Sequence, residues 1–219
     1  AGLAAQMGWH SAIEVKQDTP KWVQIDLGQS VTLSQVVLHP CQDDFNQIGD
    51  GFGFPVRFRI EAADDPAFAK DVRLLADETQ KDYPNPKIKA VSYGAGGSAR
   101  YLRITATKLV PRLNDFIFSL AEVAVLDASG RNHAASAAVT SLDSIEAAPR
   151  WQRTNLTDGW YPGVDPAKLA APSLDLARLE QARKLILESV LAEADAGALS
   201  AAEKEAAEVG QKLNVLPAP

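Results

Sequence analysis

Two short segments combine aromatic side chains with planar polar ones, a mixture that suits a ligand rich in hydroxyl groups. Carboxylate, amide and guanidinium groups match pairs of neighbouring sugar hydroxyls, while an aromatic ring packs against the C–H side of a sugar. The candidate binding residues are Asp43, Asp44, Phe45, Asn46 and Phe52 in the first segment, and Arg112, Asn114, Asp115 and Phe116 in the second. Polar residues flank Phe45, which makes it the best candidate for an exposed platform. Phe52 and Phe116 have an alternative role as core residues at the start of strands.

The sequence contains no motif for catalysis. There is no Gly-x-Ser-x-Gly elbow, and Gly94-Ala95-Gly96-Gly97 lacks the Lys-Ser/Thr that completes a phosphate-binding loop. The single Cys41 cannot form an internal disulfide, and the three histidines are far apart in the sequence. We therefore predict no catalytic residues. Hydrolysis by a pair of loop-end carboxylates remains a weaker hypothesis.

Composition describes an ordinary globular protein and argues against several classes of function. The 219 residues are 46% hydrophobic and 23% charged, which is enough apolar material for a buried core. There are 28 Asp and Glu against 22 Lys and Arg, so we expect no nucleic-acid partner. No run of 18 apolar residues occurs, and we expect no membrane span.

The front part of the chain is typical of antiparallel β-structure. Residues 54–62 alternate apolar with polar side chains, and residues 22–27 do the same before Gly28 ends the run. Further β-rich stretches are 31–38, 101–107 and 116–126. Short strands separated by Gly-, Pro- and Asn-containing turns predict a mainly β fold, an antiparallel β-sandwich or jelly roll.

The end of the chain has a different composition. All 15 aromatic residues lie at or before Tyr161, and several Pro and Gly residues interrupt regular structure over 162–172. We therefore divide the chain into a sandwich over 1–163 and a second part over 164–219. Apolar residues at helical spacing, with a capping signal at Ser173, predict a C-terminal helical hairpin that serves as a linker or docking element.

Four motifs follow one another in the order found in a known family. They are Trp22-Val23-Gln24-Ile25-Asp26-Leu27-Gly28, Phe58-Arg59-Ile60-Glu61-Ala62-Ala63-Asp64-Asp65, Ala99-Arg100-Tyr101-Leu102-Arg103-Ile104 and Leu120-Ala121-Glu122-Val123-Ala124-Val125. Together they resemble the coagulation factor 5/8 type C (discoidin) domains. The resemblance implies a galactose-binding-like β-sandwich that acts as a non-catalytic recognition module. In bacteria such modules are commonly attached to secreted carbohydrate-active enzymes.

The resemblance is incomplete at the start of the chain. Such domains usually open with a longer segment that carries an Ala- and Ser-rich strand and an Asp-Gly turn, whereas only eight residues precede Trp9 here. Residues 132–141 and Asp158-Gly159 resemble the missing pieces. Two interpretations remain: a truncated second copy, or a circular permutation in which residues 131–163 complete the first sandwich. We favour the permutation, because the termini of a domain often lie close together.

The resemblance also implies a place for a metal ion. Many family members hold a structural Ca²⁺ near the Asp-Gly turn and the Glu of the closing strand, and Asp158 and Glu122 match those positions. Asn155 or Thr157 could add oxygen ligands of the kind that Ca²⁺ takes. The alternative is that Asp158 only caps its turn and that Glu122 only pairs with an arginine.

From these observations we expect a carbohydrate-binding or targeting module of a larger secreted bacterial protein, in an extracellular or periplasmic setting. Its expected partners are a glycan or polysaccharide and neighbouring domains of the same polypeptide. The chain begins at Ala1 rather than Met, as a fragment would. The parent could be a glycoside hydrolase, and residues 51–61 bear a weaker resemblance to regions flanking bacterial α-L-rhamnosidases. The alternative hypothesis is a protein–protein interaction or scaffold module that packs on a neighbouring domain and binds no sugar.

Overall fold

The computed structural model describes residues 7–164 together with Arg183 and Lys204. The chain divides into two units, residues 1–172 and residues 173–219, and the fold below is that of the first unit. The helical hairpin predicted for 164–219 lies almost entirely outside the described residues, so the hairpin and the boundary at 163 stay predictions. No helix of the described part is long and apolar enough to cross a bilayer.

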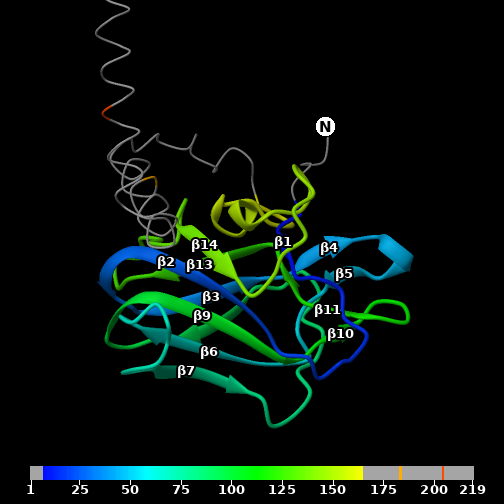
Figure 1. The fold of residues 1–219 in the computed structure, drawn as a ribbon, viewed down its shortest axis with the longest axis horizontal. Helices are drawn as coiled ribbons and strands as arrows, with labels where there is room; N and C mark the ends of the chain where they lie inside the picture. The colour runs from blue at the N-terminus through cyan, green and yellow to red at the C-terminus, as the bar shows by residue number, and fades with distance from the viewer. Residues whose placement is uncertain (1–6, 165–182, 184–203, 205–219) are drawn as a thin grey trace, which may run out of the picture. The chain divides into compact units, whose positions relative to one another are not determined.

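The larger of two main sheets has five antiparallel strands (Figure 1). Their order across the sheet is β14 (Ala138–Ser141), β2 (Lys21–Thr32), β9 (Ser98–Lys108), β6 (Arg57–Ala63) and β7 (Arg73–Glu78). The alternation predicted for residues 54–62 is confirmed in β6, where Phe58 and Ile60 are buried while Arg57, Arg59 and Glu61 are half-buried on the outer face. An alternating strand of this kind separates a core face from a solvent face.

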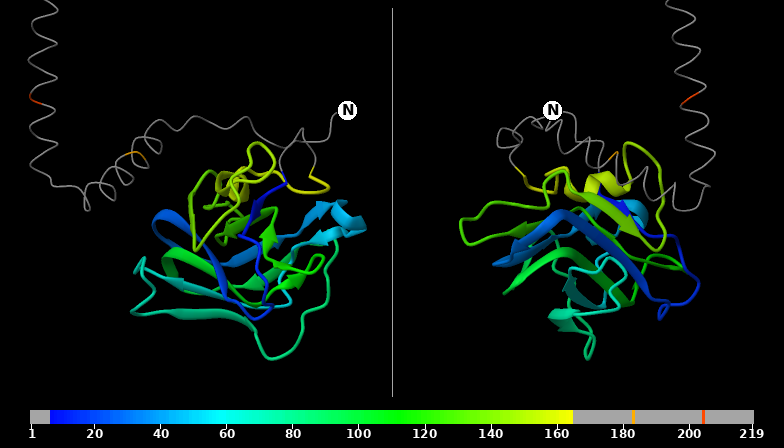
Figure 2. Two further views of the ribbon diagram at one scale, coloured as in Figure 1. Left: turned by 45° about the vertical axis from the view of Figure 1, so that its right-hand side comes forward. Right: turned by 60° about the vertical axis from the view of Figure 1, so that its left-hand side comes forward.

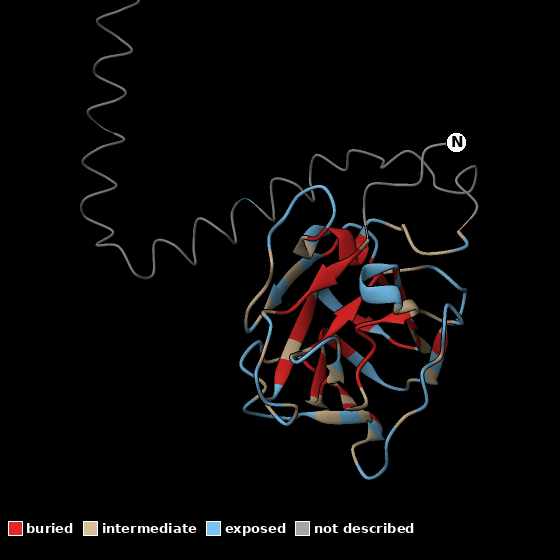
Figure 3. Ribbon diagram, turned by 90° about the vertical axis from the view of Figure 1, so that its right-hand side faces the viewer, coloured by how far each residue is buried: buried red, intermediate tan, exposed pale blue. Residues whose placement is uncertain are grey.

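A second, three-stranded antiparallel sheet covers the inner face of the first. Its order is β13 (Glu122–Leu126), β3 (Gln35–His39) and β8 (Val91–Gly94). Leu38 and Val123 from this sheet and Ile25 and Ile104 from the larger one belong to a single core, each with 0% of its surface exposed. Figure 3 shows these buried strands in red, surrounded by exposed loops in pale blue. The predicted mainly β, antiparallel sandwich is therefore confirmed.

Gly28 bends β2 instead of ending it. Its φ of 81° lies in the left-handed region that favours glycine. The Asp26 carboxylate accepts a hydrogen bond from the Gly28 amide at 2.8 Å, and the register with β9 shifts between Asp26 and Val31. The result is a β-bulge, after which the strand continues to Thr32.

Shorter ladders and turns complete one end of the sandwich. They are β1 (Trp9–His10) with β12 (Ser119–Leu120), β4 (Cys41–Asp43) with β5 (Gly49–Phe52), β10 (Val110–Pro111) with β11 (Phe116–Ile117), and the 3₁₀ turns η1 (Phe45–Gln47) and η2 (Arg153–Thr157). A second buried cluster lies here, built around Cys41, Phe52, Ile117 and Trp151.

Residues 131–163 pack on this sandwich. Strand β14 pairs with β2, with Val139 opposite Ile25, and Leu156 of η2 is fully buried in the main core. Figure 2 shows this yellow-green to yellow part of the chain covering one side of the strands. The correspondence of the segment to the opening strand of discoidin domains, and hence the circular permutation, stays a prediction.

Candidate functional site

The two candidate loops lie beside each other and project from the same end of the sandwich (Figure 1). The first runs from β4 through η1 to β5, and the second is the turn between β10 and β11. The Asn46 side-chain amide donates a hydrogen bond to the Arg112 carbonyl oxygen at 3.3 Å. The Arg112 guanidinium carbon lies 4.8 Å from the centre of the Phe45 ring, within cation–π distance. Two segments distant in sequence therefore form one surface.

Arg112 and Asp115 form a bidentate ion pair across the second loop. The Arg112 Nε donates to Oδ1 of Asp115 at 3.0 Å, and its Nη2 donates to Oδ2 at 2.7 Å. Hydrogen bonds from Arg112 lower the pKa of the Asp115 carboxyl, which is therefore ionised near neutral pH. The pair holds the planar guanidinium in one orientation beside Phe45.

Exposed side chains surround this pair. Phe45 is 41% exposed and Leu113 is 53% exposed, and Asp44, Asn46 and Asn114 are exposed as well. The backbone of the first loop is left-handed at two positions, with φ of 50° at Asn46 and 61° at Gln47. Asparagine adopts this conformation more readily than glutamine does. Strained backbone in a surface loop is concentrated at ligand sites.

Two carboxylates meet between β13 and the turn that follows η2. Glu122 has 1% of its surface exposed; its Oε2 accepts a hydrogen bond from the Gly159 amide at 3.1 Å, and its Oε1 is buried without a partner. Burial raises the pKa of Glu122 to about 9, and the charge of Asp158 adds to this. The loss of water around Asp158 raises its pKa to about 6. Each carboxylate therefore lacks a compensating positive charge.

This arrangement fits a cation. A hard cation takes carboxylate oxygens, and the unpartnered Oε1 of Glu122 is an oxygen of this kind. The Thr157 hydroxyl donates to the Ala137 carbonyl at 2.9 Å, and the Asn155 amide donates to the Pro149 carbonyl at 2.9 Å. These two residues shape the turn beside the carboxylates. Within the described residues, no group of three or more His, Cys, Asp and Glu side chains is placed to hold a metal.

Comparison with protein families identifies the fold. Residues 5–104 match the F5/8 type C family model described as a NedA-like, galactose-binding domain. This part of the chain is therefore similar to the F5/8 type C-like galactose-binding domains, and residues 7–164 are called the F5/8 type C domain below. The predicted resemblance is confirmed, and the prediction of a binding module without enzymatic activity agrees with that description. No curated protein matches the chain.

Several solved structures are similar to the F5/8 type C domain. A family 32 carbohydrate-binding module of Clostridium perfringens NanJ, in complex with galactose, is 22% identical, with 55% of this chain and 77% of that one covered and a TM-score of 0.40. Module CBM32-3 of a C. perfringens family 31 glycoside hydrolase is 22% identical, with 54% and 74% covered and a TM-score of 0.41. CpGH89CBM32-5 from C. perfringens, in complex with GalNAc-β-1,3-galactose, is 14% identical, with a TM-score of 0.37; the match covers 49% of this chain and 66% of the length of that one.

Three of the predicted binding residues support the loops of the F5/8 type C domain from beneath. Asp43 is 6% exposed, and its carboxylate accepts hydrogen bonds from the Phe45 amide at 3.0 Å and from Arg150 Nη2 at 2.6 Å. Phe52 is 2% exposed and packs against the Trp151 ring, with 5.8 Å between ring centres. Phe116 is half-buried against the main core. For Phe52 the expected contact with ligand is thereby corrected to a packing role, because its ring has no free face.

The structure adds three residues to the site that the sequence did not suggest. His10 of β1 lies 5.2 Å from the Trp151 ring and 5.9 Å from the Phe52 ring, measured between ring centres. Its burial lowers the pKa of the imidazole. Arg150 and Trp151 reach the loop from the far end of the domain sequence. No local pattern marks these residues, because only the fold brings them together.

Proposed function

We propose that the F5/8 type C domain is a non-catalytic module that binds glycans through its paired loops. The observation that carries this proposal is the joint surface of Phe45, Arg112 and Asp115, in which an exposed aromatic ring adjoins a fixed guanidinium–carboxylate pair. The planar pair offers donors and acceptors for adjacent hydroxyls, and the ring offers a surface for C–H groups. Asp44, Asn46 and Asn114 extend the polar part of this surface.

The setting of the module is part of the proposal. We infer a larger secreted bacterial protein, extracellular or periplasmic, whose other domains the module directs to a polysaccharide. Glycoside hydrolysis would belong to those other domains. The description of the family as galactose-binding and the galactose-containing complexes of similar modules support galactose-type sugars as the first ligands to test.

A structural Ca²⁺ is the cofactor that we propose for this domain. Glu122 and Asp158 would hold it, since one buried oxygen of Glu122 has no partner and both carboxyls have raised pKa values. The ion would neutralise the two carboxylates and tie the turn after η2 to β13. No chemical step depends on it.

The second candidate function is a scaffold module that packs on a neighbouring domain. Leu113 favours it, because this apolar side chain is 53% exposed at the tip of the second loop, and the preceding residue Arg112 lies against Phe45. An interface would bury both side chains together with the Arg112–Asp115 pair. Exposed aromatic and arginine side chains are also typical of protein–protein interfaces.

A glycan array probed with the full chain separates the two functions. We expect binding to galactose-containing glycans, lost in Phe45→Ala and in Arg112→Ala. Matched controls are Leu74→Ala on β7, where the side chain is 53% exposed, and Arg131→Ala at an exposed arginine. These controls should bind like the wild type. Absence of binding to every glycan would reject the first function in favour of the second.

A further inference from the structure

A groove of about 460 Å³ lies on the outer face of the larger sheet and shares no lining residue with the paired loops. It is lined by Gln17, Asp18, Arg57, Arg59, Thr79, Thr107 and Lys108. The lining comes from β6 and β9, the residue that follows β7, and the segment that precedes β2 (Figure 1). Its volume falls within the range of about 300–1,000 Å³ found for small-molecule sites.

Most of the charged side chains that line this groove are positive. Three cations line it, Arg57, Arg59 and Lys108, with Asp18 as the single carboxylate of the lining. The carboxylates that pair with the cations, Asp82 and Glu61, are not part of the lining. Cations therefore outnumber carboxylates three to one among the residues that line the groove.

The ion pairs leave the ends of both arginines available. Asp82 accepts from the Arg57 Nε at 2.7 Å, and Glu61 lies 2.9 Å from the Arg59 Nε. The two Nη groups of each guanidinium make no hydrogen bond in the described part of the protein. This end-on pair of donors is the geometry that binds a carboxylate through both of its oxygens. Lys108 shares Asp82 with Arg57, at 2.7 Å, and adds a second cation beside it.

Neutral groups along the same groove suit hydroxyls. The Thr79 hydroxyl donates to Asp77 at 2.5 Å and accepts from the Gln80 side-chain amide at 3.1 Å, which leaves one lone pair as an acceptor. The Gln17 amide donates to the Leu109 carbonyl at 3.0 Å, which leaves its side-chain oxygen as an acceptor. Arg59 also lies in register with Thr105, which pairs with Trp22 on β2. An aromatic side chain therefore stands two strands away on the same face, where the Arg103 guanidinium carbon lies 4.6 Å from its ring centre.

We propose that this groove is a second glycan site and that it binds a sugar carrying a carboxylate, a uronic acid unit. The carboxylate pairs with the Nη groups of Arg57 and Arg59, and Lys108 adds its charge. The threonine hydroxyls and Gln17 take the ring hydroxyls. This site shares no residue with the paired loops, so the module would hold a polysaccharide at two places, which raises its effective affinity.

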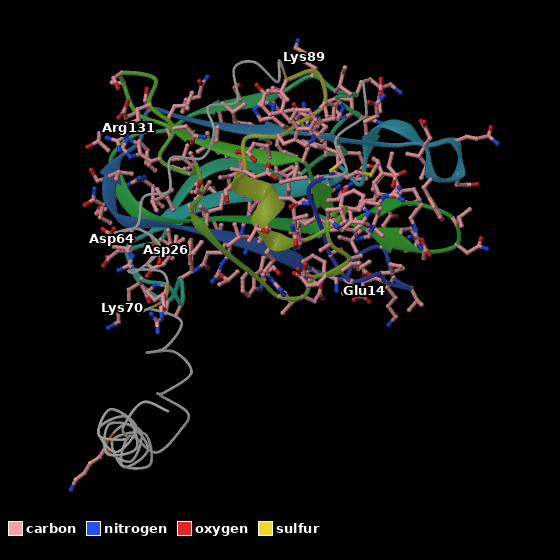
Figure 4. The ribbon with its side chains drawn as sticks, turned by 90° about the horizontal axis from the view of Figure 1, so that it is seen from above. Glu14, Asp26, Asp64, Lys70, Lys89 and Arg131 are labelled. Carbon is pink, nitrogen blue, oxygen red and sulfur yellow. The ribbon has the colours of Figure 1, made fainter. Side chains whose placement is uncertain are left out.

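The test titrates the full chain with tri-galacturonic acid and, separately, with neutral galactotriose. Arg57→Gln and Arg59→Gln should each weaken tri-galacturonate binding at least about tenfold, because each removes a charged bidentate contact. The matched control Arg131→Gln removes the same charge from an exposed arginine outside the groove, which is labelled in Figure 4. Raising the salt concentration should weaken the wild-type interaction. Amide signals of Arg57, Thr107 and Lys108 should shift in NMR spectra during the titration.

The outcomes distinguish this site from the loop site. Loss of tri-galacturonate binding in Phe45→Ala, with retention in both groove variants, would overturn the proposal and assign the uronate to the loops. Equal weakening by Arg131→Gln, or no binding by the wild type, would also overturn it. Sodium sulfate that displaces tri-galacturonate at equal concentration would reduce the groove to a general anion site and reject its role in sugar binding. Galactotriose binding tests the loop site separately. We expect it to be lost in Phe45→Ala and kept in Arg57→Gln and Arg59→Gln.

Discussion

Arg150 and Asp43 form an ion pair of 2.6 Å across 107 residues of sequence. The Asp43 side chain is 7% exposed, and its other oxygen accepts the amide hydrogen of Phe45. The segment that precedes η2 therefore fixes the backbone of the candidate binding loop from below. This relationship links the architecture of the domain directly to the geometry of its proposed site.

We predict that Arg150→Met lowers the free energy of unfolding by about 1–3 kcal/mol, because it leaves a buried carboxylate without its charged partner. It should also weaken glycan binding, since Asp43 would no longer hold the first turn of the loop. Urea unfolding and a galactose titration measure the two effects. The double variant Asp43→Asn, Arg150→Met should recover part of the stability, and Arg131→Met serves as the control. Unchanged stability in Arg150→Met would contradict this role.

The sequence predicts the frame of this fold better than it predicts its site. Alternation over residues 54–62 reports a local property, the two faces of one strand, and β6 shows that pattern. Asp43 and Asp44 illustrate the limit. They are adjacent and chemically identical, yet Asp43 is buried against Arg150 while Asp44 is exposed. Burial at a loop depends on which distant segment lies beneath it, and no local pattern contains that information.

The same difference between local pattern and distant contacts explains why the sequence did not predict the roles of Gly28 and Trp151. A glycine after an alternating run is a common end of a strand, but here the strand continues past the bulge because β9 offers further pairing at Val31. Trp151 lies in a segment without alternation, and its role comes from Phe52, on which it stacks. The resemblance to discoidin domains is specific because its four motifs span several strands of the sandwich. Arg150 and Trp151, which support the candidate loops, lie outside those motifs.

Lys21 gives a second prediction. Its ammonium is buried and contacts the carboxylates of Glu14 and Asp143, and so joins the N-terminal segment to the chain after β14. Burial alone would lower the pKa of Lys21, but the two carboxylates outweigh burial and raise it. We expect Lys21→Met to cost about 3 kcal/mol, the lower end of the range for a broken buried pair, since both carboxylates are partly exposed. Thermal unfolding against the exposed control Lys16→Met checks this value.

His10 gives a prediction about pH. Burial lowers the pKa of its imidazole below the ordinary 6.5, and the charge of Arg112 acts in the same direction. The opposing influences are the hydrogen bond to the Ser11 carbonyl and the charges of Asp43 and Asp115. Above pH 6.5 the imidazole is neutral in both folded and unfolded chains. As the pH falls below 6.5 the unfolded chain takes up a proton first, so the stability that His10 contributes is lost.

Urea unfolding at pH 7.5 and 5.5 measures this loss. We expect the wild type to lose more stability between the two values than His10→Gln does, because the variant has no imidazole to titrate. Titratable groups that do not interact with His10 contribute equally to both proteins and cancel in the difference. An NMR titration that placed the folded His10 pKa at or above 6.5 would remove the basis of the prediction.

Calcium gives the last prediction. If Glu122 and Asp158 hold a structural Ca²⁺, the ion binds only the folded chain and must raise the unfolding temperature, by an amount equivalent to about 2.7 kcal/mol when its concentration is 100 times the dissociation constant. Glu122→Gln and Asp158→Asn should abolish this rise, since each removes a charged oxygen ligand from the pair. Asp18→Asn, at an exposed carboxylate elsewhere, should keep it.

In EDTA, Glu122→Gln should be at least as stable as the wild type, because a neutral amide replaces a buried carboxyl that lacks a partner for one oxygen. Identical melting of the wild type in EDTA and in millimolar Ca²⁺ would exclude the metal, and would leave Glu122 as the acceptor for the Gly159 amide alone.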